Sequence, residues 1–302
     1  MSYCQFPTLV VAALAAAATT SAIAVPANVQ TLYNNIKNGG ACSDQLATGF
    51  YSSEDGPGTY SYCADTTSNI LYIKGPSTKL ANMDIDCDGT QDGPGDDGRC
   101  GSSDDTQGTT SFADTVAGYN KGVDDLNAYV HPYVVFGNAD DSGSGNYETF
   151  DPREYGVEPL SLMAVVCGDK LIYGIWGDEN GSDDEHPMVG EASLSLATAC
   201  FGTSMNGNNG HDEDDVLYIA FPGSDAVPGA DGAAWNAQSY AAFESSIVGL
   251  GNTLIGRIGG GGGGEEPGET CSWEGHCLGA SCQSGDDCSD DLICTNGACA
   301  NP

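Results

Sequence analysis

Two carboxylates stand beside strongly apolar segments of the chain, Asp178 in the run GIWGDENG and Glu191 in the run VGEASLSL. Paired carboxyl groups at a fixed separation can hydrolyse a glycosidic bond, one protonating the leaving oxygen while the other assists attack on the sugar. Glycines flank Asp178 after an apolar segment, so we expect it at a strand end beside a cleft. Glu191 begins a segment rich in Ala and Leu, which predicts either a helix start or a buried strand. The competing interpretation is an N-cap Asp and a helix-start Glu, which are both common.

The charge of the chain is strongly unbalanced, with 43 acidic residues against 8 Lys and Arg and a formal net charge of -35. Such an excess disfavours nucleic acids and anionic membrane surfaces as partners. It would attract a polycation, and the attraction would weaken as salt is added. Solubility is the competing explanation, because many extracellular proteins are acidic without binding any cation.

The N-terminus is typical of a secretory signal peptide. An apolar run from Leu9 to Ala18 precedes the small-residue pattern Ala22-Ile23-Ala24, which predicts a mature start at Val25 and a secreted, extracellular protein. No later stretch is long and apolar enough to cross a bilayer. Removing Cys4 leaves 12 of the 13 cysteines, an even number that fits disulfides formed in an oxidising compartment. Six lie in the body, Cys42, Cys63, Cys87, Cys100, Cys167 and Cys200, and six lie between Cys271 and Cys299.

A run of six glycines, Gly259 to Gly264, marks a domain boundary, because it cannot nucleate regular structure and behaves as a tether. We therefore predict a signal peptide at 1–24, a catalytic body at 25–258, a linker at 259–270 and a Cys-rich module at 271–302. The module is too short for an apolar core and depends on its bridges.

The body carries a mainly β pattern. Val29, Leu32, Tyr33 and Ile36 recur at helical spacing within 25–38, and a second apolar periodicity predicts a helix over about 236–258. Between them, short apolar runs bounded by Gly, Asp, Asn or Pro predict strands, and 167–170 predicts a hairpin turn. We expect a barrel-like or sandwich body with two or three flanking helices, plus the small disulfide-rich C-terminal module. The predicted strands are 70–73, 133–136, 160–167, 171–176 and 216–221.

Several motifs in order resemble one family. The runs NMDIDCDG (82–89), HPYVVFGN (131–138), LIYGIWGDENG (171–181), VGEASLSLATACFG (189–202) and DVLYIAFPG (215–223) are similar to the fungal chitosanases of glycoside hydrolase family 75. The resemblance extends over about 32–258. It implies that Asp178 and Glu191 are the catalytic carboxylates. It also implies endo-hydrolysis of chitosan, a β-1,4-linked glucosamine polymer, with inversion at the anomeric carbon.

Local surroundings suggest different roles for the two acids. We hypothesise that Glu191 donates the proton, because partial burial beside Ala and Leu would raise its pKa. Asp178, in a polar loop of Gly, Asn and Ser, would stay ionised and activate water.

Substrate contacts follow from charge and shape. Glucosamine carries an ammonium in mild acid, so Asp84 and Asp86 are predicted to bind it. Trp176 and Tyr155 are predicted to stack on sugar faces, although burial in the core is an equally good interpretation of Trp176.

No metal or other cofactor is predicted. The run from Asp84 to Gly89 imitates the opening of a calcium loop, but the twelfth position is Gly95 rather than the bidentate Glu. A solvated acidic turn held by Cys87 is the preferred interpretation. The four His residues form no HxH or HExxH pair.

The Cys-rich module contains Trp273 and His276, which suggest binding to a cell-wall polymer, with a protease-resistant end cap as the alternative. We expect a monomer.

Two other function classes stay open: a non-catalytic cell-wall protein that binds cationic polysaccharide by charge alone, and a hydrolase of a neutral or partly acetylated glucan.

Overall fold

The structure of the chain is a computed structural model that describes residues 23–101, 103, 106–140, 143, 145, 147–182, 186–259, 284, 288, 293–295 and 298–300. The chain divides into two units, Met1–Gly259 and Gly260–Pro302. Residues 1–22 of the predicted signal peptide, nearly all of the linker, and Trp273 and His276 lie outside the described residues.

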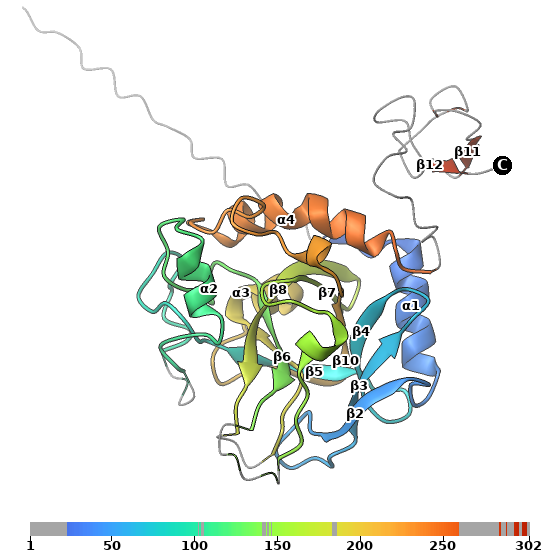
Figure 1. The fold of residues 1–302 in the computed structure, drawn as a ribbon, viewed down its shortest axis with the longest axis horizontal. Coiled ribbons are helices and arrows are strands. Elements are labelled where there is room, and N and C mark those ends of the chain that lie inside the picture. The colour runs from blue at the N-terminus through green and yellow to red at the C-terminus, as the bar shows by residue number, and fades with distance from the viewer. Residues whose placement is uncertain are drawn as a thin grey trace, which may run out of the picture. The chain divides into compact units, whose positions relative to one another are not determined.

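Six strands of the first unit close into a ring (Figure 1). Each strand pairs with the next in the order β5-β9-β6-β8-β7-β10, and β10 returns to β5. The mainly β prediction is confirmed, and of its two alternatives, barrel-like or sandwich, the closed ring is barrel-like and leaves these strands without a free edge. In that order the strands are β5 (Ala81–Asp86), β9 (Glu191–Ser193), β6 (Tyr133–Asn138), β8 (Lys170–Asn180), β7 (Leu162–Cys167) and β10 (His211–Ala220).

Further strands extend the ring at two places. The C-terminal end of β10 pairs with β4, which continues through β3 to β2. The first residues of β8 pair with β1, whose two residues directly precede the predicted cleavage point. The bounds are β1 (Ile23–Ala24), β2 (Gln45–Phe50), β3 (Tyr60–Asp65) and β4 (Ile70–Lys74).

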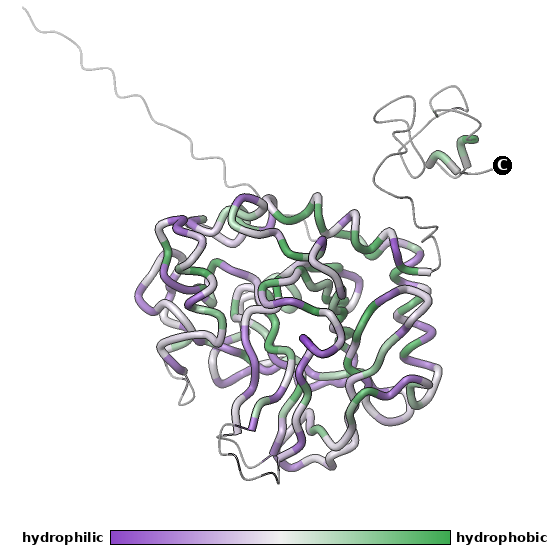
Figure 2. Tube along the Cα trace, viewed as in Figure 1, coloured by the Kyte–Doolittle hydropathy of each residue, from purple (hydrophilic) through white to green (hydrophobic). Residues whose placement is uncertain are grey.

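Two central strands, β6 and β7, are buried along their whole length, which explains their continuous apolar runs. Every residue of β6 and β7 is buried, and Figure 2 shows hydrophobic residues in the central strands and hydrophilic ones in the outer loops. The predicted hairpin joins β7 to β8, with Cys167 opposite Lys170 and Gly168 at φ 63°. Of the two central residues of the turn, Gly168 and Asp169, only Gly168 has a positive φ.

The helices lie around the ring. Both predicted helices form: α1 (Ala27–Asn38) buries Val29, Leu32, Tyr33 and Ile36 as expected, and α4 (Tyr240–Ile255) packs on β7 and β8. Ser239 caps α4 through its side chain, which accepts from the amide of Ala242. Shorter helices complete the body, namely α2 (Ala113–Gly118), α3 (Leu194–Phe201), η1 (Pro152–Tyr155) and η2 (Ser224–Ala226).

The six body cysteines form three disulfides, in agreement with the even count: Cys42–Cys63, Cys87–Cys100 and Cys167–Cys200. In the second unit, β11 (Ile293–Thr295) and β12 (Ala298–Ala300) form an antiparallel pair, and Cys288 is bonded to Cys299.

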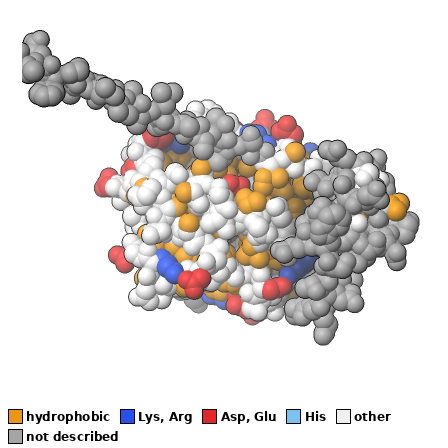
Figure 3. Space-filling model, turned by 90° about the horizontal axis from the view of Figure 1, so that it is seen from above, with side chains coloured by type: hydrophobic (Ala, Val, Ile, Leu, Met, Phe, Trp, Pro, Cys, Tyr) orange, Lys and Arg blue, Asp and Glu red, His pale blue; other side chains and the backbone are white. Residues whose placement is uncertain are grey.

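The surface on the side of α4 shows apolar side chains among uncharged ones, with Asp and Glu mainly toward the edge (Figure 3). The large excess of carboxylates is therefore not spread evenly over this face. Of the helices in the described part of the chain, none combines the length and apolar character that a bilayer-spanning segment needs.

Candidate active site

Four residues form a row across four neighbouring strands of the ring. Asp84 on β5 pairs with Glu191 on β9, Glu191 pairs with Val135 on β6, and Val135 pairs with Asp178 on β8. Paired residues of adjacent strands point to the same face of a sheet. Asp178, Val135 and Glu191 accordingly line one pocket, together with residues of the loop that follows β5. The two carboxylates singled out by the sequence are thus separated by a single intervening strand.

A bulge in β8 brings Asp178 into this row. Trp176 pairs with Val134 and Asp178 pairs with Val135, so Gly177 is an extra residue on β8. A Cβ atom at Gly177 would lie 2.5 Å from Cβ of Tyr133, which only glycine avoids. The expectation that Asp178 occupies a polar loop was wrong, because β8 continues to Asn180 and the bulge presents Asp178 from within the strand.

Asp178 is buried, with 5% of its surface exposed. Its Oδ1 accepts hydrogen bonds from the Ser111 amide at 2.9 Å, the Ser111 hydroxyl at 2.5 Å and the Glu179 amide at 2.8 Å. Its Oδ2 is also buried and has no hydrogen-bond partner among the described residues. Burial raises the pKa of Asp178 to about 6, while the donors from Ser111 and Glu179 act in the opposite direction.

Asp86 lies close to Asp178 and is equally buried, at 5% exposure. One carboxyl oxygen from each of Asp86, Asp88 and Asp178 lies within 4.8 Å of the other two. The Oδ1 of Asp86 accepts from the Asp88 amide at 2.6 Å and from the Tyr133 hydroxyl at 3.0 Å. Burial, and then the negative charges of Asp178 and Asp88, raise the pKa of Asp86 well above its usual range. A buried acidic cluster of this kind lowers its charge by binding protons or a cation.

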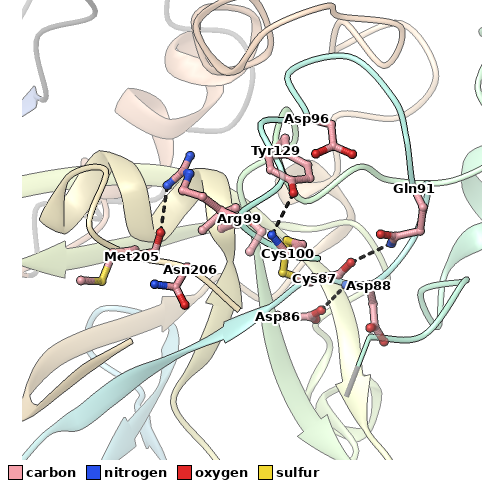
Figure 4. The surroundings of a disulfide bond; sticks show 12 residues. Asp86, Cys87, Asp88, Gln91, Asp96, Arg99, Cys100, Tyr129, Met205 and Asn206 are labelled. Atoms are coloured by element: carbon pink, nitrogen blue, oxygen red, sulfur yellow. Dashed lines mark hydrogen bonds between the residues drawn. A yellow bond between two sulfur atoms is a disulfide. The ribbon is translucent and has the colours of Figure 1, made fainter. Parts of the chain in front are cut away.

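The segment after β5 is anchored by a disulfide. Cys87 stands between Asp86 and Asp88 and is bonded to Cys100, whose amide donates to the Tyr129 hydroxyl at 2.9 Å (Figure 4). The interpretation of this segment as a solvated turn was wrong, because its first residues form part of a largely buried strand. The alternating acids of DIDCDG begin in a paired strand, where Asp84 and Asp86 share one face.

Glu191 begins β9, and the helix α3 starts three residues later at Leu194. The two interpretations of this segment, strand and helix start, therefore each describe part of it. Ser193 ends the strand and caps the helix, because its hydroxyl accepts from the Leu196 amide at 3.4 Å. Glu191 is partly exposed and lines the pocket. The lining residues are Ile85, Asp86, Cys87, Asp88, Gln107, Val135, Asp178, Glu179, Asn180, Gly181 and Glu191.

The other predicted contact residues occupy different positions. Asp84 lies beside Glu191 in the row, and burial raises its pKa to about 6. Trp176 is fully buried, so the core interpretation holds for it. Its ring packs edge-on against Phe112, and its Nε1 donates to the Asp178 carbonyl at 2.9 Å. Tyr155 is 38% exposed and lines a second depression, which shares Glu179 with the first.

Two residues of the site, Ser111 and Tyr133, were not identified from the sequence. Ser111 lies 67 positions from Asp178, and a single serine in a polar loop carries no local signal. Tyr133 reads as one more apolar residue of a buried strand, although its hydroxyl reaches Asp86. The one available signal was the glycine that precedes Asp178, because an isolated Gly in a strand often marks a bulge.

Comparison with known proteins identifies the family of the chain. A family model described as fungal chitosanase of glycosyl hydrolase group 75 matches residues 83–257. An endo-chitosanase of Aspergillus oryzae is 45% identical over 256 residues, which cover 83% of this chain and 98% of the relative. An endo-chitosanase of Aspergillus fumigatus is 43% identical over 76% of this chain and 90% of its own length. An endo-chitosanase B of Aspergillus oryzae is 42% identical over 80% of this chain and 95% of its own length. With a family match over more than half of its residues and relatives covered almost from end to end, the chain belongs to the fungal chitosanases of glycosyl hydrolase group 75.

Proposed function

We propose that this glycoside hydrolase is an endo-chitosanase that cleaves β-1,4 linkages between glucosamine units with inversion at the anomeric carbon. The observation that carries the proposal is the placement of Asp178 and Glu191 in one row and one pocket, with a single strand between them. The names of the relatives support chitosan as the substrate.

The spacing of the strands supports inversion. Neighbouring strands are about 4.8 Å apart, so two strand spacings separate the backbones of Asp178 and Glu191 by roughly 10 Å. Inverting glycosidases hold their carboxyl groups about 6.5 to 9.5 Å apart, which leaves room for a water molecule, whereas retaining enzymes need about 5 to 5.5 Å. Directly adjacent strands would suit the shorter distance, and one intervening strand suits the longer one.

We assign the general base to Asp178 and the general acid to Glu191. Three donors on Oδ1 of Asp178 favour its ionised form, while burial raises its pKa to about 6 and makes it a stronger base than an exposed Asp. In the reaction, the water oxygen bonds to the anomeric carbon and its proton passes to Asp178. The glycosidic bond breaks as the leaving oxygen takes the proton of Glu191.

Acidic residues and an exposed ring beside the pocket support selection of an aminosugar chain. Asp84 neighbours Glu191, and Glu179 lines the pocket. The second depression contains Asp140, Glu154 and the ring of Tyr155, which stacks on Phe150 with ring centres 5.3 Å apart. Each ammonium near an exposed carboxylate gains about 1 kcal/mol or less, so several contacts must act together along a polymer. The two depressions share Glu179 and would hold successive sugars.

The substrate assay is reducing-sugar release from chitosans of graded acetylation, compared with cellulose and chitin. We expect the rate to fall as acetylation rises and cellulose to stay intact. A rate that ignores acetylation would indicate a neutral-glucan hydrolase, and salt-dependent binding without new reducing ends would indicate a polymer-binding protein.

The site assay uses variants of the two carboxylates. Asp178→Asn and Glu191→Gln should each lower kcat about 10²- to 10⁴-fold, while the surface control Asp231→Asn should match the native enzyme. Azide should restore turnover of Asp178→Ala, because it replaces the activated water, and should leave Glu191→Ala inactive. The opposite azide pattern would exchange the two roles, and native kcat in either neutral variant would overturn the proposal.

We also propose that the enzyme is secreted. The apolar run at 9–18 and the body disulfides support this proposal.

The Cys-rich module is proposed to hold the enzyme on a cell-wall polymer. Truncation at the glycine run should lower retention on insoluble chitosan and leave soluble turnover unchanged. Equal retention would favour the end-cap alternative.

A further inference from the structure

Asp86 and Asp178 form a buried acidic pair. They come from β5 and β8, and their carboxyl oxygens meet within 4.8 Å together with that of Asp88. Within the described residues, neither Asp86 nor Asp178 forms an ion pair with Lys or Arg. Two carboxylates this close in a desolvated site cannot both stay ionised, so the pair retains a proton.

The hydrogen bonds indicate which residue retains it. Oδ1 of Asp178 receives three donors, which stabilise a negative charge there. Around Asp86, the Tyr133 hydroxyl lies 3.0 Å from both the Asp86 carboxyl and the Asp88 carbonyl, so one hydrogen faces two acceptors. Oδ1 of Asp86 therefore has one full donor, the Asp88 amide, and a shared one, against three full donors on Oδ1 of Asp178, so the negative charge is better stabilised on Asp178 and the proton stays on Asp86.

The orphaned oxygen points to the same arrangement. Oδ2 of Asp178 is buried without a partner, although a buried carboxylate oxygen without a donor is costly. Asp86 has a carboxyl oxygen within 4.8 Å of one of Asp178, and when it is neutral its O–H can supply the missing hydrogen. Asp88, Tyr133 and Asp125 also act on the charge of the pair, and Glu179 and Glu191 line the same pocket; none of these groups is a cation at working pH.

We propose that Asp86 is a neutral carboxylic acid in the active enzyme and directs its O–H at Oδ2 of Asp178, which makes it a positioning residue for the general base. The inference rests on the proposed function, because it takes Asp178 as the base. The hydrogen bond stabilises the ionised form of Asp178, so that Asp178 is ionised at a pH at which glucosamine is still cationic. The second lone pair of Oδ2 stays available to the attacking water.

The test compares two substitutions of Asp86 through the pH profile of kcat/KM. Asp86→Asn keeps a neutral donor, so its acid limb should coincide with that of the native enzyme and kcat should stay within about tenfold. Asp86→Ala removes the donor, so the acid limb should move up by about one pH unit and kcat should fall about tenfold or more. Asp92→Asn is the control, because Asp92 is exposed on the same loop with φ 55°, which Asn also adopts.

Three results would overturn the proposal. An acid limb that moves down in Asp86→Asn would mean that Asp86 is an anion whose removal eases ionisation of Asp178. A native profile in Asp86→Ala would mean that Asp86 does not act on the base. Activation of the EDTA-dialysed native enzyme by calcium chloride would mean that a cation, rather than a proton, neutralises the cluster.

A spectroscopic measurement covers the case in which a variant does not fold. Infrared spectra of the native enzyme at pH 7 should contain the carbonyl stretches of two protonated carboxylic acids, Glu191 and Asp86. Glu191→Gln should keep the Asp86 band, and Asp86→Asn should lack it. Absence of a protonated carboxylic acid band in Glu191→Gln would refute the proposal. The proposed function is tested separately by the neutral variants of Asp178 and Glu191, so the two failures are distinguishable.

Discussion

Replacing Asp178 by Asn should stabilise the protein at high pH and do so much less at low pH. The pKa of Asp178 rises from 3.8 to about 6 on folding, so the native state holds this proton more tightly than the unfolded state. The stability linked to that proton is fully present below pH 3.8 and is lost as the pH rises through 6. A pKa rise of this size corresponds to about 3 kcal/mol. Asn at this position cannot ionise, so the variant does not lose this stability as the pH rises. Its amide oxygen can still accept a hydrogen bond from Ser111.

The measurement is urea unfolding of the native enzyme and Asp178→Asn at pH 4 and pH 8, followed by the fluorescence of the buried Trp176 and Trp235. The stability advantage of the variant should be larger at pH 8 by about 2 to 3 kcal/mol, or roughly 4 to 12 °C in Tm. Asp92→Asn should show no such change with pH. An equal advantage at both pH values, or a larger one at pH 4, would refute the claim that burial holds the proton on Asp178.

Three further predictions concern the surroundings of the base and the substrate. Gly177→Ala should destabilise the fold by about 1 to 3 kcal/mol in thermal unfolding and lower kcat, because the added methyl displaces the bulge. Gly118→Ala, with open space at Cβ, should change neither quantity. Replacing Cys87 and Cys100 together by Ala should cost about 3 kcal/mol in urea unfolding and reduce kcat, and native kcat would show that the anchor does not serve the site. Tyr155→Ala should raise KM for polymer up to about tenfold at constant kcat, and an unchanged KM would remove the second depression from the binding path.

The elements that could be predicted from the sequence are those with a one-sided or continuous apolar pattern. The helix at 27–38 and the β7–β8 hairpin formed as expected, because their periodicity and turn glycine are local properties. The strand β5 was missed, since alternating aspartates look like a solvated turn when their buried face is unknown. Trp176 shows the same limitation, because a sugar platform and a core residue have identical sequence signatures.

The sequence by itself determined which residues are available for chemistry: the acidic excess, the paired cysteines, the glycine tether, and two carboxylates beside apolar runs. Only the tertiary structure decided that one strand separates those carboxylates, that a bulge at Gly177 aims Asp178, and that Ser111 and Asp86 reach it from distant segments. The physical reason is that strand order and desolvation arise from which segments meet in space. A carboxyl group's proton affinity depends on those neighbours far more than on the residues beside it in the chain.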